Sequence, residues 1–296
     1  EGRGKKAAGG VFSRLLSVSF PLTLGSCVAS FGGVLDLGLI MRRIETLGYT
    51  PAEASAVYGN YSTLCMPMFT LVSSLIAPLS MAYLPRLSAA RVRDDREFFS
   101  QCAGEYLSFS GALFFPAMFG LAVYSEEILM FLFADESAEI AAPLLVLLAP
   151  AVCVFSLLTV LNTVSESCGY MRVPLISMLV SSLIKPVCSY FLLGNLSFGI
   201  AGAPVGTVVA YTAGLLFSLA FLLGRKNLRF PVLRPLVMPC VCAAGAGFVP
   251  RLLCGTFSFG RGLPFPVLFA VSAALYLILL SLCGFFGGKK SKNRAF

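Results

Sequence analysis

The chain has 296 residues, of which 57% are hydrophobic and only 12% charged, and its formal net charge is +8. A soluble domain of this length needs more charged residues to cover its surface, so the composition indicates a chain that is solvated mostly by lipid. The sequence has no His and no C-x-x-C pair, so we predict no metal site and no cofactor. We also expect no nucleic-acid partner, because membrane topology explains the basic charge.

The elements expected in chain order are a basic, Gly-rich linker over 1–13 and then about eight apolar helices. Residues 1–13 look like a linker inside a longer chain rather than a signal peptide, because the apolar segment that follows has no cleavage-site pattern. The apolar runs are continuous and do not alternate, which favours helices over a β-barrel. The sequence therefore predicts an all-α integral membrane protein. The runs lie at 15–41, 62–84, 103–124, 141–161, 173–193, 199–223, 235–250 and 263–286.

The basic residues predict the orientation of these spans. With eight spans, most of the 22 basic residues fall on the side that holds both ends of the chain, including the basic tail 287–296. Only Arg42, Arg43, Arg251 and Arg261 fall on the other side, together with the acidic loop 125–139. By the positive-inside rule, both termini are cytoplasmic. Anionic lipid headgroups are the expected partners of the cytoplasmic basic residues.

Interrupted helices are expected in the first two spans, which are rich in Gly and Pro. The second span contains Pro67 and Pro78, and we expect it to end at Pro85. Proline removes a backbone hydrogen bond, and transporters use such breaks to line a cavity. The alternative is that Gly and Pro are simply more frequent in membrane helices.

Lys185 is the basic residue predicted deepest in the membrane, roughly 20 Å into the fifth span. Ser181 and Ser189 lie four residues to either side of it, which places all three on one helical face. A charge inside a span is costly unless it faces water or a partner, so we expect Lys185 to face a wet cavity. The alternative is a structural lysine satisfied by neighbouring carbonyl groups.

Two further groups of polar residues are candidates. Asn162 and Glu166 lie on one face of the fourth span, although Glu166 fits a solvated helix end equally well. Asp36 precedes Arg42 and Arg43 near the outer end of the first span. The two arginines match the geometry of a phosphate headgroup, whereas the alternative is a charge cluster that fixes the depth of the helix.

Three segments show a family resemblance. LDLGLIMRRIETLGYTPAEASAVYGNYS (35–62), VPLISMLVSSLIKPVCSYFLLGN (173–195) and GIAGAPVGT (199–207) resemble the stage V sporulation protein B family of polysaccharide transporters. This family belongs to the multidrug/oligosaccharidyl-lipid/polysaccharide exporter superfamily, whose fold has two six-helix lobes and often two further helices. The resemblance implies that 14–224 is the second lobe and that 225–286 is the extra pair.

The resemblance also implies a function, namely flipping of an undecaprenyl-pyrophosphate-linked glycan for cell-wall (peptidoglycan) or spore-envelope polysaccharide. Six positions match the family pattern, and five of them, all except Asp36, are expected to contact the substrate. Ser181 and Ser189, on the face of Lys185, are further candidates for substrate binding, and Asp36 and Glu166 are candidates for ion coupling. The family usually has Gln at position 166 and Asn at position 189, so Glu166 would repel a pyrophosphate that reached it. The matching positions are Asp36, Arg42, Arg43, Tyr61, Asn162 and Lys185.

Two other functions stay open at this point. A multidrug or cation-coupled exporter of the same superfamily would favour buried carboxylates over buried cations. A membrane-bound transferase acting on the same lipid carrier would need a general base, and the sequence has no His. No nucleotide-binding loop of the G-x-x-x-x-G-K type occurs, which argues against direct use of ATP. We therefore expect a transporter and not an enzyme.

Overall fold

The computed structural model describes residues 23, 27, 31, 33–34, 36–46, 48–133, 137–193, 199–224, 233–256 and 265–282. The elements within these ranges are all helices, and none is a strand. The predicted linker 1–13 and the basic tail 287–296 lie outside the described residues. The all-α fold predicted from the sequence is confirmed.

A first helix is described through Thr46 and is followed by a long helical rod, which begins at Pro51 and ends at Val92. The rod consists of α2 (Pro51–Asn60), η1 (Tyr61–Cys65), α3 (Met66–Ser74) and α4 (Ile76–Val92). The remaining elements are α5 (Arg96–Val123), α6 (Ser125–Phe133), α7 (Ser137–Ser167), α8 (Arg172–Leu193), η2 (Gly199–Ala201), α9 (Gly202–Leu223), α10 (Leu233–Thr256) and α11 (Phe265–Leu282).

The rod corrects the predicted bounds of the second span, because it starts earlier and continues through Pro85. Its start is set by a capping box. The Thr50 hydroxyl accepts the Glu53 N–H, and the Glu53 carboxylate accepts the Thr50 N–H. This first turn is polar, so a search for apolar runs overlooks it. Residues 61–65 form a π-helical turn that ends two positions before Pro67, whose ring nitrogen cannot donate a hydrogen bond.

The acidic segment 125–139 is also corrected, because it is not a loop throughout. Its first part is α6, whose two acidic residues, Glu126 and Glu127, lie in the first turn. Carboxylates are favourable there because of the helix dipole. Within the apolar run 128–133, Leu129 is buried in the core and the last four residues are exposed.

Five described helices are long and apolar enough to cross a membrane, and two further apolar helices are shorter. The five span Pro51–Val92, Arg96–Val123, Ser137–Ser167, Arg172–Leu193 and Gly199–Leu223, and the shorter pair spans Leu236–Val249 and Pro266–Leu282. Most of the predicted first span lies outside the described residues, so the expected total of about eight stays a prediction.

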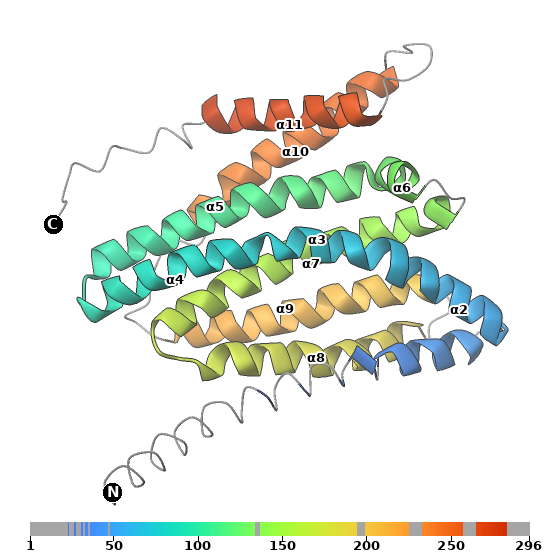
Figure 1. The fold of residues 1–296 in the computed structure, drawn as a ribbon, viewed down its shortest axis with the longest axis horizontal. Coiled ribbons are helices and arrows are strands. Elements are labelled where there is room, and N and C mark those ends of the chain that lie inside the picture. Colours follow the sequence, from blue (N-terminus) through green and yellow to red (C-terminus); the bar gives the residue numbers. More distant parts are fainter. Residues whose placement is uncertain are drawn as a thin grey trace, which may run out of the picture.

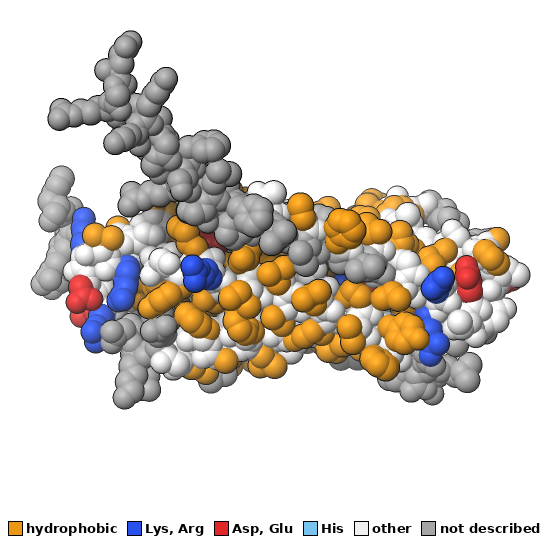
Figure 2. All heavy atoms as spheres, turned by 90° about the horizontal axis from the view of Figure 1, so that it is seen from below, with side chains coloured by type: hydrophobic (Ala, Val, Ile, Leu, Met, Phe, Trp, Pro, Cys, Tyr) orange, Lys and Arg blue, Asp and Glu red, His pale blue; other side chains and the backbone are white. Residues whose placement is uncertain are grey.

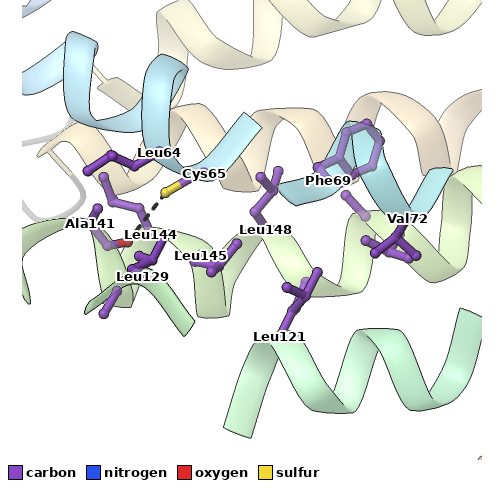
Figure 3. Packing of buried hydrophobic residues seen from close by; sticks show 14 of the residues in the cluster. Leu64, Cys65, Phe69, Val72, Leu121, Leu129, Ala141, Leu144, Leu145 and Leu148 are labelled. Atoms are coloured by element: carbon purple, nitrogen blue, oxygen red, sulfur yellow. Dashed lines mark hydrogen bonds between the residues drawn. The ribbon is translucent and has the colours of Figure 1, made fainter. Parts of the chain in front are cut away.

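The helices form a layered bundle (Figure 1). The first helix, α8 and α9 lie together on one side, α7 runs through the middle, and α5 separates it from α10 and α11 on the opposite side. The largest core cluster joins the rod to α5, α6 and α7, and Figure 3 shows Leu64, Phe69 and Leu148 within it. Inside this cluster the Cys65 thiol donates a hydrogen bond of 3.4 Å to the Ala141 carbonyl oxygen.

The face that carries α8 and the first helix is largely apolar in its middle (Figure 2). Charged side chains on this face gather mainly toward its two ends. Such a distribution is expected of helices that cross a hydrocarbon layer and end in water.

Candidate functional site

The central feature of the site is an ion pair between the first helix and α8. The Nζ atom of Lys185 lies 3.2 Å from Oδ2 of Asp36. The Asp36 side chain is 5% exposed, whereas the Lys185 side chain is 24% exposed. The structure thus pairs Asp36 with Lys185 of α8. The ammonium is therefore the more accessible half of the pair.

Three tyrosines interact electrostatically with the carboxylate of this pair. Tyr58, Tyr61 and Tyr211 lie within electrostatic range of Asp36. The Tyr61 hydroxyl is buried in the π-helical turn and forms a hydrogen bond of 3.2 Å with the Thr207 hydroxyl on α9. Tyr61 thus lies beside the predicted cationic site and connects the rod to α9.

The two arginines of the first helix have different environments. The Arg43 guanidinium stacks over the ring of Tyr190 on α8, 5.0 Å from its centroid. A cation above an aromatic face is attracted by the ring quadrupole, so this contact is a second link between the first helix and α8. Arg42 is exposed.

Ser181 and Ser189 lie in the contact between α8 and α9. A Cβ atom on Gly206 would meet the Ser189 hydroxyl oxygen at 3.0 Å, and one on Gly214 would overlap the Ser181 hydroxyl oxygen. Both serines are buried and keep the two helices close. Packing accounts for their small size, and their contact with a substrate stays a prediction.

Asn162 lies in a separate polar cluster. Its Oδ1 atom accepts hydrogen bonds from the hydroxyls of Ser177 on α8 and Ser218 on α9, at 3.0 Å and 3.2 Å. Ser177 precedes Lys185 by two helical turns, so Asn162 is not brought to the ion pair. Glu166 is exposed near the C-terminal end of α7. That position agrees with the alternative of a solvated helix end.

An apolar cavity of about 400 Å³ lies on the other side of the bundle, between α5, α10 and α11. Pro116, Phe269 and Leu277 contribute to its wall. The Tyr124 hydroxyl lies beside it and forms a hydrogen bond of 2.7 Å with the Ser272 hydroxyl of α11. The cavity can hold hydrocarbon, because its wall offers few polar groups.

The model of the lipid II flippase MurJ family matches residues 46–259, which is more than half of the chain. The chain belongs to the MurJ lipid II flippase family. Its helices make it a multi-pass membrane protein. Membership in a family of transporters removes the support for a membrane-bound transferase.

Individual relatives agree with membership in the MurJ family. The chain is 22% identical over 283 residues to stage V sporulation protein B of Bacillus subtilis (strain 168), covering 91% of this chain and 52% of that protein. A solved structure of lipid II flippase MurJ in an inward closed conformation is similar in fold, with a TM-score of 0.71 and 17% identity. That match covers 93% of this chain and 55% of the flippase.

Two more distant solved structures share the fold. A MOP superfamily transporter from Pyrococcus furiosus has a TM-score of 0.59 at 18% identity, covering 80% of this chain and 52% of that one. An inward-facing MATE family multidrug resistance transporter has a TM-score of 0.57 at 16% identity, covering 92% and 62%. The chain thus spans about half the length of the curated relative and of the MurJ structure.

Sequence reasoning missed Ser177, Ser218 and Thr207, which hold the polar clusters together. A signal for them was present. Residues at spacing four on α9, from Gly202 through Gly206, Ala210 and Gly214 to Ser218, are all small and all buried. That row predicts a close partner helix whose facing residues are also small.

Proposed function

We propose that this chain forms one lobe of a flippase that moves a lipid-linked glycan pyrophosphate across the membrane by alternating access. The observation that carries the proposal is the Lys185 ammonium, which is partly exposed inside a membrane span of a chain from the MurJ family. Intramembrane charges are expensive and are usually retained for function. An ammonium at this depth attracts an anionic headgroup.

In this proposal the cationic residues bind the pyrophosphate. Arg42 and Arg43 meet the headgroup from the outer end of the first helix, and Lys185 binds it deeper in the lobe. Guanidinium groups suit this role because they form paired hydrogen bonds with phosphate oxygens. Tyr61 and Asn162 are the proposed polar contacts to the rest of the headgroup, with Ser181 and Ser189 behind Lys185. Tyr61 lies within electrostatic range of Asp36, and Arg43 lies on the same helix as Asp36 and contacts Tyr190 of α8, the helix that carries Lys185.

The lipid part of the substrate needs an apolar path. The cavity between α5, α10 and α11 is a suitable place for part of a hydrocarbon chain, since its wall is apolar, α5 is long enough to cross a membrane, and α10 and α11 are apolar helices. The segment 225–286 is thereby given a role as an addition to the six-helix lobe 14–224. The bounds of the six-helix lobe and of the additional segment are proposals.

A second lobe is the proposed partner, because the chain spans about half of its relatives. Transporters of this type place the substrate site between two lobes. We propose cytoplasmic termini, with the basic loops close to anionic lipids. Asp36 and Glu166 remain candidates for ion coupling.

Binding of undecaprenyl pyrophosphate to the protein in nanodiscs tests the proposal, with undecaprenol as the uncharged control ligand. Lys185→Gln should weaken binding of the pyrophosphate lipid at least tenfold and leave undecaprenol unaffected. Arg172→Gln, an exposed basic residue on the same helix, is the matched control and should bind like the wild type. Equal binding of both lipids by the wild type would exclude a headgroup site. Saturable binding of organic cations with no binding of pyrophosphate would favour the multidrug exporter instead.

A further inference from the structure

The position of Lys185 is not explained by packing. Five of the six buried residues of α8 form a row with a spacing of four, namely Val173, Ser177, Ser181, Ser189 and Leu193, and the sixth is Pro186. Lys185 occupies the position in this row between Ser181 and Ser189. The serines of the row pack against glycines of α9. A small residue at position 185 would continue this contact without any cost of burying charge.

The carboxylate that faces Lys185 is only half satisfied. Oδ2 of Asp36 pairs with the ammonium, but Oδ1 is buried and has no hydrogen-bond partner among the residues that the structure describes. The Tyr61 hydroxyl, which lies within electrostatic range of Asp36, forms its hydrogen bond with the Thr207 hydroxyl. A buried ion pair is strongly held only when further hydrogen bonds complete it. The hold of Asp36 on Lys185 therefore rests on one contact.

Among the described residues, Lys185 is the basic residue that forms an ion pair with Asp36. Tyr58 and Tyr61 from the rod and Tyr211 from α9 lie within its electrostatic range, and they are neutral at physiological pH. On the same helix as Asp36, the Arg43 guanidinium is stacked on Tyr190. Lys185 is thus the counter-ion of Asp36, and it is also the more exposed member of the pair.

We infer that Asp36 is an internal competitor for the anion site of Lys185, and that it sets a charge threshold for ligands. In the structure the Asp36 carboxylate is paired with the Lys185 ammonium. A phosphate group must displace a full negative charge, so a ligand with two or more charges, such as a pyrophosphate, succeeds where a singly charged phosphodiester fails. Asp36 is a specificity-determining residue that acts through Lys185. This inference rests on the proposed anion site and adds its selectivity.

Binding of inorganic pyrophosphate and of dimethyl phosphate to the protein in nanodiscs of neutral lipid tests the inference. Wild type should prefer pyrophosphate. Asp36→Asn should bind pyrophosphate at least tenfold more tightly and should also bind dimethyl phosphate, because the competing charge is gone. Glu105→Gln is the matched control, since it removes the carboxylate of the exposed Arg86–Glu105 pair between α4 and α5. Its binding should equal that of the wild type.

Two outcomes separate this inference from the proposed function. If Lys185→Gln loses pyrophosphate and Asp36→Asn binds it no more tightly than the wild type, the anion site stands and the competition is refuted. If Lys185→Gln binds like the wild type, both ideas fail. Repeating the titration with undecaprenyl pyrophosphate separates the source of the anion. If Asp36→Asn binds only undecaprenyl pyrophosphate more tightly than the wild type does, the ligand is a lipid-linked pyrophosphate. If it binds both undecaprenyl pyrophosphate and inorganic pyrophosphate more tightly, the site recognises the phosphates themselves.

A spectroscopic measurement keeps the test valid if Asp36→Asn does not fold. Asp36→Ser also removes the charge within the available space and serves as the second variant. In the wild type, infrared difference spectra on adding pyrophosphate should show a carboxylate band that shifts as Asp36 leaves Lys185. The band should be missing in Lys185→Gln. An unchanged carboxylate region in the wild type, with pyrophosphate bound, would overturn the displacement.

Discussion

Gly214 marks a place where α8 and α9 leave no space for a side chain. An added Cβ would overlap the Ser181 hydroxyl oxygen and meet the Ser177 carbonyl oxygen at 2.8 Å. We predict that Gly214→Ala destabilises the protein by about 1–3 kcal/mol, because the backbones must separate. Thermal unfolding in detergent measures this. Gly59→Ala on α2 is the control, since nothing lies within 4 Å of its added Cβ, and it should be neutral or slightly stabilising.

The Asn162 cluster gives a second prediction at the scale of single residues. Ser218 donates to Asn162 Oδ1, whereas Ser177 also donates to the Pro174 carbonyl oxygen. Asn162→Ala and Ser218→Ala should therefore be coupled in a double-mutant cycle by about 0.6 kcal/mol, the average for hydrogen bonds between membrane helices. Ser108→Ala, whose hydroxyl bonds within α5, should add independently to Asn162→Ala. A coupling energy of zero for the first pair would contradict the observed contact.

At the scale of elements, Tyr124 fastens the two C-terminal helices to the lobe. It lies at the end of α5, and its hydroxyl bonds to Ser272 on α11 and donates to the Gly247 carbonyl oxygen of α10 at 3.3 Å. We predict that Tyr124→Phe speeds hydrogen exchange in α10 and α11 about threefold or more and leaves α8 and α9 unchanged. Tyr49→Phe, at an exposed position, is the control. Uniform faster exchange in all helices would indicate general destabilisation instead.

The sequence predicts elements better than it predicts their partners. The predicted span 173–193 differs from α8 by one residue, and the predicted span 199–223 coincides with η2 and α9 together, because the ends of these helical segments coincide with the ends of apolar runs. The start of the rod at Pro51 was missed because capping, not hydrophobicity, sets it. Helix α6 was missed for a similar reason, because the two glutamates of its first turn interrupt the apolar pattern.

The candidate site was predictable in its charges but not in its pairing. Lys185 and Asp36 were both recognised, since a charge within an apolar run stands out. Their contact depends on how the first helix docks against α8, which no local pattern records. Asn162 was grouped with Lys185 on the basis of the family resemblance, and the structure instead places it two turns away, with Ser177 and Ser218.

At the scale of the whole molecule, the orientation in the membrane follows from the distribution of charge. Arg91, Arg93 and Arg96 lie around the turn between α4 and α5, whereas α6 begins with two glutamates at the other end of α5. Because lysines and arginines are retained on the cytoplasmic side, the turn at Asp94 should be cytoplasmic and the start of α6 external. Both Asp94 and Glu126 are exposed, so each position can report its side.

Cysteine labelling in intact cells tests this orientation. Glu126→Cys should react with a membrane-impermeant maleimide from outside, whereas Asp94→Cys should react only after the cells are permeabilised. The parent protein is the baseline, and its reaction should be weak because its described cysteines are mostly buried or half-buried. Labelling of Asp94→Cys in intact cells, with Glu126→Cys protected, would show that the topology is the reverse of the proposed one. Arg42 and Arg43, at the same end of the bundle as α6 in this proposal, would then meet a headgroup from the cytoplasmic side.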